Sequence, residues 1–191
     1  MRAFLLMIIL LVASVCVAQS PADDAPARNP VPLEQRESFD TFTEAIDASD
    51  IEPEVRAIAL VARGDIYAGL AVPALDHAIA DYTAAIDMDG VQVEHLIDAL
   101  LARADAYTDL PVPRLEDAIA DYSSVIDIPT ATVTDKVRAT NNRGRAYGRL
   151  DPPETEKEIA DFTSVIEMAE VSVDSKCLAL TNRGNAYRLR V

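Results

Sequence analysis

The segments FTEAID at residues 42–47, YTAAID at 82–87, YSSVID at 122–127 and FTSVIE at 162–167 repeat one pattern at a fixed step along the chain. A second series keeps the same step: ARGDIY at 62–67, ARADAY at 102–107, NRGRAY at 142–147 and NRGNAY at 182–187. Self-similarity at such a period is typical of stacked repeats, in which one unit cannot bury its apolar face alone. The period therefore predicts a repeat array over residues 32–191.

Each 40-residue unit contains two helical patterns. Between Leu75 and Ile86, for example, apolar residues recur at the spacing of a helix with one apolar face. Strand signals are absent, because no segment alternates regularly between apolar and polar residues. The expected fold is all-α, an α-solenoid of four 40-residue antiparallel helical hairpins. Its helices are expected at 33–48, 54–69, 74–88, 93–109, 114–128, 133–149, 154–168 and 173–189.

Local signals agree with these helices. Pro53 falls at an expected helix start, where a missing backbone N–H costs nothing. Thr132, Asp151 and Ser172 are candidate N-caps. Gly90 can end a helix in the left-handed conformation.

Eight of the ten aromatic residues occupy two sites of the period. They are Tyr67, Tyr107, Tyr147 and Tyr187 in one helix, and Phe42, Tyr82, Tyr122 and Phe162 in the other. Ligand stacking is one role for such rings. Recurrence in every unit favours packing between successive hairpins, so we expect these rings in the core.

At these residues the chain resembles the tetratricopeptide repeat family. Leu180 with Gly184 and Tyr187 is similar to the family's first-helix segment, and Ala78 with Tyr82 is similar to its second-helix segment. The family's usual unit is shorter, at about 34 residues, so this chain has longer loops, in which respect it leans towards the Sel-like relatives. The resemblance implies a concave binding surface lined by the first helix of each hairpin, with the terminal helices acting as caps.

Arginines and aspartates also follow the period. Arg63, Arg103, Arg143 and Arg183 share one site, and Asp81, Asp121 and Asp161 follow the first three at one constant spacing. Thr41 stands at the aspartate site of the first expected helix, which has no preceding partner helix. This coincidence predicts pairing within each hairpin, since a guanidinium can bind a carboxylate through two hydrogen bonds. A row of ligand-binding arginines is the alternative.

The N-terminus has the pattern of an export signal. A positive start, an apolar run from Phe4 to Val15 and a small residue at Ala18 predict a cleaved signal peptide at 1–18. The apolar run is too short to span a bilayer. Lipid attachment at Cys16 is the alternative. A Pro/Ala-rich linker, expected to be disordered, follows at 19–31. The mature chain would be an exported protein, periplasmic or secreted, with Cys177 as its one cysteine and therefore no intrachain disulfide.

The chain has a formal net charge of -15. This acidity argues against binding to nucleic acid or to an anionic membrane surface, because both require basic residues. Residues 32–111 carry 17 acidic and 4 basic residues, whereas 112–191 carry 13 acidic and 11 basic ones. The expected binding surface is therefore acidic at one end and more basic at the other.

No catalytic arrangement is visible in the sequence. His77 and His95 fall in different expected helices, and no Cys/His/Asp cluster has zinc-ligand spacing. Cys177 has no nearby histidine and is expected to behave as a buried or half-buried small hydrophobe. We therefore expect neither an enzyme nor a metal or cofactor site.

The family pattern places one set of polar side chains on the basic end of the concave surface. The candidate ligand-binding residues are Arg138, Asn141, Arg145, Arg149, Asn185 and Arg188. They are similar to a carboxylate clamp for a peptide end. The expected function is an exported scaffold that binds a peptide or protein segment. The alternative is a repeat protein that binds a small molecule, metal or glycan as an accessory to an envelope enzyme or transport system.

Overall fold

The computed structural model describes residues 31–189, and this range is all-helical, without strands. Its helices are α2 (Leu33–Asp47), α3 (Pro53–Ala68), α4 (Leu75–Ile86), α5 (Val93–Asp109), α6 (Leu115–Asp127), α7 (Val133–Arg149), α8 (Thr155–Glu167) and α9 (Val173–Leu189). The expected signal peptide and residues 19–30 of the expected linker lie outside the described residues. Val31 was placed in the linker, but it is 1 % exposed and belongs to the packed domain.

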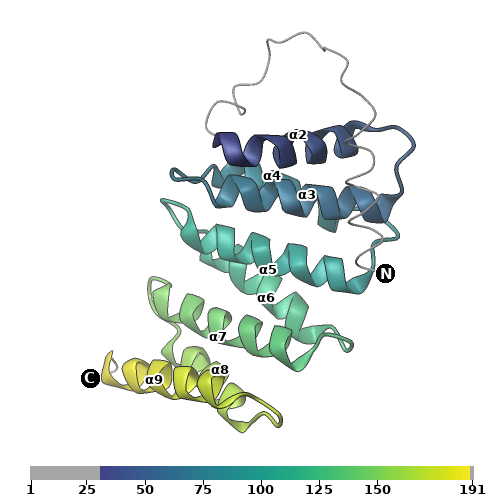
Figure 1. Cartoon of the computed structure of the whole chain (residues 1–191). Helices are drawn as coiled ribbons and strands as arrows, with labels where there is room; N and C mark the ends of the chain where they lie inside the picture. The colour runs from purple at the N-terminus through teal and green to yellow at the C-terminus, as the bar shows by residue number, and fades with distance from the viewer. Residues whose placement is uncertain (1–30, 190–191) are drawn as a thin grey trace.

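The helices stack as antiparallel hairpins in two layers (Figure 1). We call α3, α5, α7 and α9 the first helices, which form the near layer, and α2, α4, α6 and α8 the second helices. Neighbouring first helices approach one another along the stack, whereas neighbouring second helices do not approach as closely. The array is therefore tighter on the side of the first helices. This arrangement is the α-solenoid expected from the period.

Helix starts and ends follow local chemistry. Pro53 is the first residue of α3. Thr132 forms a capping box with Asp135 at the start of α7, and the Ser175 N–H donates to Ser172 Oγ at 3.2 Å before α9. Asp151, the third expected N-cap, precedes α8 by too many residues and does not cap it.

The core is built by rings that pack over small residues. Tyr82, Tyr122 and Phe162 of the second helices are at most 1 % exposed. A Cβ added to Gly64 would lie 2.5 Å from Tyr82 Cε1, so the glycine allows the ring to approach the α3 backbone. Ala104 occupies the equivalent site opposite Tyr122 and is fully buried. These contacts explain why small residues and rings recur together.

Three expectations about burial were wrong at the ends of the stack. Tyr187 is 51 % exposed and Phe42 is only half-buried, because no further helix covers them within the described residues. Cys177 is exposed for the same reason. On the same helix as Cys177, Leu180 is 47 % exposed.

An arginine on each of α3, α5 and α7 links two neighbouring second helices. Arg103 on α5 donates from Nε and Nη2 to the two carboxylate oxygens of Asp121 on α6, at 2.8 Å each, and from Nη1 to Thr83 on α4 at 3.0 Å. The same two-bond pairs join Arg63 to Asp81 and Arg143 to Asp161. In all three pairs, the side chains are largely buried. The pairing expected from the constant spacing is therefore present in each of these hairpins.

Candidate functional site

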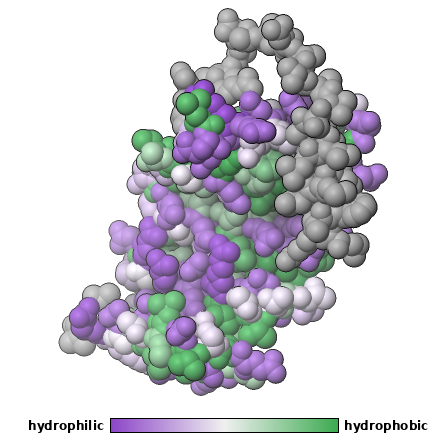
Figure 2. All heavy atoms as spheres, in the orientation of Figure 1, coloured by the Kyte–Doolittle hydropathy of each residue, from purple (hydrophilic) through white to green (hydrophobic). Residues whose placement is uncertain are grey.

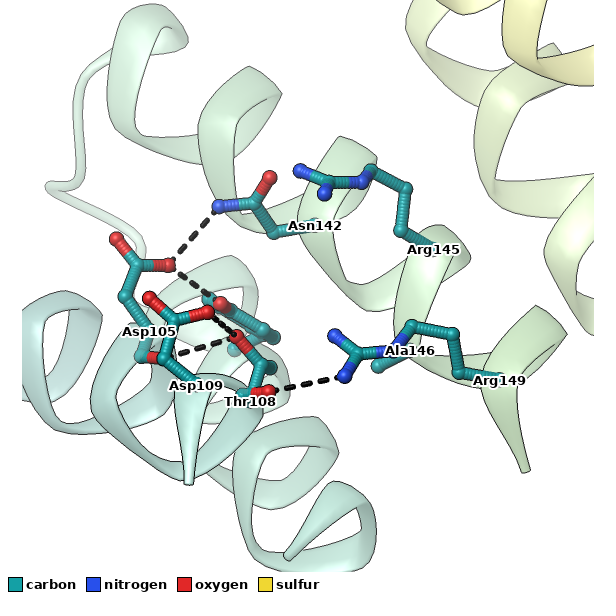
Figure 3. Close-up of a pocket in the computed structure, with 8 residues that line it drawn as sticks. Asp105, Thr108, Asp109, Asn142, Arg145, Ala146 and Arg149 are labelled. Atoms are coloured by element: carbon teal, nitrogen blue, oxygen red, sulfur yellow. Dashed lines mark hydrogen bonds between the residues drawn. The ribbon is translucent and has the colours of Figure 1, made fainter. Parts of the chain in front are cut away.

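A pocket of about 280 Å³ opens between α5, α6 and α7 (Figure 3). Its lining residues are Asp105, Thr108, Asp109, Tyr122, Asn142, Arg145, Ala146 and Arg149. The α7 arginines extend towards the acidic residues of α5. The pocket therefore has cationic groups on one wall and carboxylates on the other. In space-filling view, hydrophilic residues gather over these middle helices (Figure 2).

Asp105 is the centre of a hydrogen-bond network in this pocket. It accepts from the Tyr122 hydroxyl, from Arg138 Nη2 and from Asn142 Nδ2, the last at 3.0 Å. Burial of the phenol, together with the Asp105 charge, raises the pKa of Tyr122 above its usual value, so the hydroxyl stays protonated and donates. The network fixes three helices relative to one another. It also means that Arg138 is already paired with a carboxylate.

The two pocket arginines differ in their partners. Arg149 donates from Nη2 to the Thr108 carbonyl at 3.0 Å, which anchors its guanidinium to the end of α5. Arg145 is exposed and has no hydrogen-bond or ion-pair partner among residues 31–189. Its guanidinium points from α7 into the space between α5 and α7 (Figure 3). Arg145 is therefore the cation of this pocket that is available to an anionic ligand.

The same surface is acidic one hairpin earlier. Asp65 on α3 accepts from the Tyr82 hydroxyl at 2.8 Å, as Asp105 does from Tyr122. Asp98, however, stands one repeat before Arg138, so the neighbouring charge is a carboxylate instead of a guanidinium. Burial raises the pKa of Asp65, and repulsion by Asp98 adds to that rise. Burial raises the pKa of Asp98 as well.

The structure brings together only some of the candidate ligand-binding residues. Arg145 and Arg149 line the pocket, and Arg138 lies beside it through Asp105. Asn185 and Arg188 lie exposed on α9, outside the pocket lining.

Asn141 is misplaced in the sequence interpretation. It is 6 % exposed, so it cannot serve as an open ligand-binding amide. Its equivalent on α5, Leu101, is 1 % exposed, which shows that this site of the period is a packing site. The pocket residue is its neighbour Asn142. The spacing Arg138, Asn142, Arg145 follows one helix face, and that periodicity could have identified Asn142 from the sequence.

The histidines contact neighbouring side chains and form no cluster. His95 Nε2 lies 2.9 Å from a Glu54 carboxylate oxygen, and His77 lies beside the Tyr67 ring with centroids 5.1 Å apart. Among the described residues, no group of three or more His, Cys, Asp or Glu side chains is arranged to hold a metal ion.

Comparison with family models, with curated proteins and with solved structures finds no match to this chain. Within residues 31–189, none of the helices has the length and apolar character needed to cross a membrane. The site is therefore interpreted from its own residues.

Proposed function

We propose that this chain is an exported, tetratricopeptide-like scaffold that binds a peptide or protein segment on the surface of its first helices, without catalysis or a cofactor. The observation that carries the proposal is the guanidinium of Arg145, which lines the pocket between α5 and α7 and has no partner in the described part of the chain. The N-terminal pattern of residues 1–18 supports export.

Arg145 suits a carboxylate because a guanidinium presents two parallel N–H donors that match two carboxylate oxygens. Its neighbours are already engaged, since Arg138 pairs with Asp105 and Arg149 with the Thr108 carbonyl. These contacts hold the pocket walls in place, which lowers the cost of ordering on binding. A C-terminal carboxylate, or an Asp or Glu side chain, is the group expected at Arg145.

The acidic end of the surface suggests what accompanies that carboxylate. Charge on Asp65 and Asp98 is unfavourable in the folded chain, as the raised pKa of each shows. Burial is the main cause of both shifts, and a cationic group placed beside the two carboxylates would favour their charged forms. The proposed ligand is therefore a segment with a basic residue near Asp65 and Asp98 and a carboxylate at Arg145.

Isothermal titration with a short basic peptide tests this proposal. We expect a peptide with a free C-terminal carboxylate to bind, and its C-terminal amide or the variant Arg145→Gln to bind at least about tenfold more weakly, as removal of a charge-assisted contact implies. Arg114→Gln is the matched control, because Arg114 is an exposed arginine paired with Asp117 on α6. Equal affinities for acid and amide, or equal losses in both variants, would reject the carboxylate site.

Thermal melts with Ca²⁺ and with glycans distinguish the alternative function. The scaffold proposal predicts no stabilisation by either ligand. Stabilisation by one of them, without any effect of peptides, would instead favour a small-molecule, metal or glycan carrier.

A further inference from the structure

One side of α9 has the composition of a packing surface, but no helix within residues 31–189 covers it. Leu180 is 47 % exposed, whereas Leu100, its equivalent on α5, is 6 % exposed. Tyr187 is 51 % exposed and its equivalent Tyr107 is 7 % exposed. Figure 2 shows the hydrophobic residues that gather over α9 at the end of the stack. On α5 the corresponding side is covered by the second helix α6.

Gly184 lies at the centre of this surface. A Cβ added to Gly184 would meet nothing within 4 Å, whereas one added to Gly144 would lie 3.0 Å from Phe162 Cε1 and one added to Gly64 would lie 2.5 Å from Tyr82 Cε1. In the inner hairpins, this small-residue site receives an aromatic ring of the following second helix. The same site on α9 is open among the described residues.

Arg183 adds a charge to the open side. It keeps the contact to the preceding second helix, since Nη1 donates to Thr163 Oγ1 at 3.1 Å, as Arg103 Nη1 does to Thr83. Arg103 also donates from Nε and Nη2 to Asp121, but Arg183 meets no carboxylate among residues 31–189. Arg183 is half-buried, and its bond to Thr163 anchors the side chain beside the apolar patch.

We infer that this side of α9 binds an amphipathic helix of a partner protein, in which an aspartate is followed directly by tyrosine or phenylalanine. The aspartate would pair with Arg183, and the ring would lie over Gly184 and beneath Leu180. Three second helices of this chain show the pattern: each has an aspartate before a ring, and an apolar residue four positions after the aspartate. These apolar residues are Ala85, Val125 and Val165, all at most 2 % exposed.

A second folded copy of this chain does not offer such a helix from its described residues. The aspartates of α4, α6 and α8 are already paired with arginines of their own hairpins. The remaining second helix, α2, carries Thr41 at the aspartate site and has no carboxylate there for Arg183. Charge complementarity therefore favours a different protein as the occupant. This inference does not depend on the pocket at Arg145.

Fluorescence anisotropy with a labelled peptide of residues 112–129 of this chain tests the inference, because that segment contains the α6 pattern. We expect the purified chain to bind it, and Gly184→Leu to weaken binding at least about tenfold by filling the ring site. Arg183→Gln in the protein, or Asp121→Asn in the peptide, should each weaken binding about tenfold, as loss of a charge-assisted pair implies. Lys176→Gln removes a positive charge from the same helix and should have no effect.

Circular dichroism of each variant shows whether α9 stays helical, so a loss of binding is separable from a loss of fold. Two outcomes overturn the inference. The first is a peptide affinity that is absent, or that is unchanged by Gly184→Leu and Arg183→Gln in folded protein. The second is concentration-dependent self-association of the chain alone, removed by Gly184→Leu in sedimentation velocity, which would assign the surface to a second copy.

Discussion

Replacement of Asp121 by alanine tests whether the arginine–aspartate pairs hold neighbouring hairpin helices together. Asp121 accepts two hydrogen bonds of 2.8 Å from Arg103, and the two side chains are 9 % and 15 % exposed. Breaking a buried ion pair by removal of one partner costs about 3–5 kcal/mol, because the other charge stays buried. Arg103 keeps its contact to Thr83 and has some access to water, so we expect a lower loss of about 2–3 kcal/mol.

Thermal melts followed by circular dichroism measure this loss. For a domain of this size, about 2–4 °C of melting temperature correspond to 1 kcal/mol, so Asp121→Ala should lower the midpoint by about 5–10 °C. Arg103→Leu combined with Asp121→Ala removes both charges and should recover part of the loss. Arg183→Leu is the matched control, because it removes an arginine that has no carboxylate partner among the described residues. A midpoint unchanged by Asp121→Ala, or equal losses for Asp121→Ala and Arg183→Leu, would refute the reasoning.

Three further predictions concern stability. Asp65 has a raised pKa in the folded state, so its charge lowers stability as pH rises through that pKa. Asp65→Asn should therefore raise the melting temperature at pH 7 and have no effect at a pH below the pKa of Asp65 in both the folded and the unfolded chain. A pH series of melts in which the variant gains stability only at low pH would contradict this. Gly64→Ala should destabilise the chain by about 1–2 kcal/mol, because the added methyl group collides with the buried Tyr82 ring. Gly184→Ala should stabilise it by about 0.5–1 kcal/mol, because nothing lies near the added methyl group. Denaturant titrations in which both variants change the free energy of unfolding in the same direction would contradict this packing. Thr132→Ala removes the capping box of α7 and should cost about 1 kcal/mol in the same titrations, with an unchanged midpoint as the contrary result.

The repeat period was sufficient to predict the helices and their pairing. The expected helix at 93–109 coincides with α5, and the one at 133–149 coincides with α7. The one at 173–189 coincides with α9, and the remaining helices begin and end within two residues of their expected bounds. Helix phase and the constant arginine–aspartate spacing are local properties that one sequence displays directly. The helices and the arginine–aspartate pairs could therefore be predicted from the sequence.

Burial at the ends of the stack could not be predicted from the period alone. Tyr187 repeats the pattern of Tyr67 and Tyr107, so the sequence indicates a core ring. Burial at this site depends on a following helix, and none follows α9 among the described residues. The pocket was predicted incompletely for a different reason. Choosing Asn141 over Asn142 is an error of one residue, and on a helix one residue turns a side chain by about 100° from the groove into the packing surface.

Partner assignments inside the pocket also required the structure. Arg138, Arg145 and Arg149 are equivalent in sequence as basic residues of one helix face. Only the three-dimensional arrangement shows that Asp105 and the Thr108 carbonyl engage two of them and leave Arg145 without a partner in the described part of the chain.

The proposed binding surface is tested most directly by nuclear magnetic resonance of the arginine Nε–H groups. The signals are followed during titration with a basic peptide that ends in a free carboxylate. The account predicts that the Arg145 signal shifts in proportion to occupancy, that the Arg103 and Arg143 signals stay in place because their carboxylates hold them, and that the amidated peptide leaves Arg145 unshifted. An Arg145 signal that does not move at saturation, or equal shifts with both peptides, would contradict it.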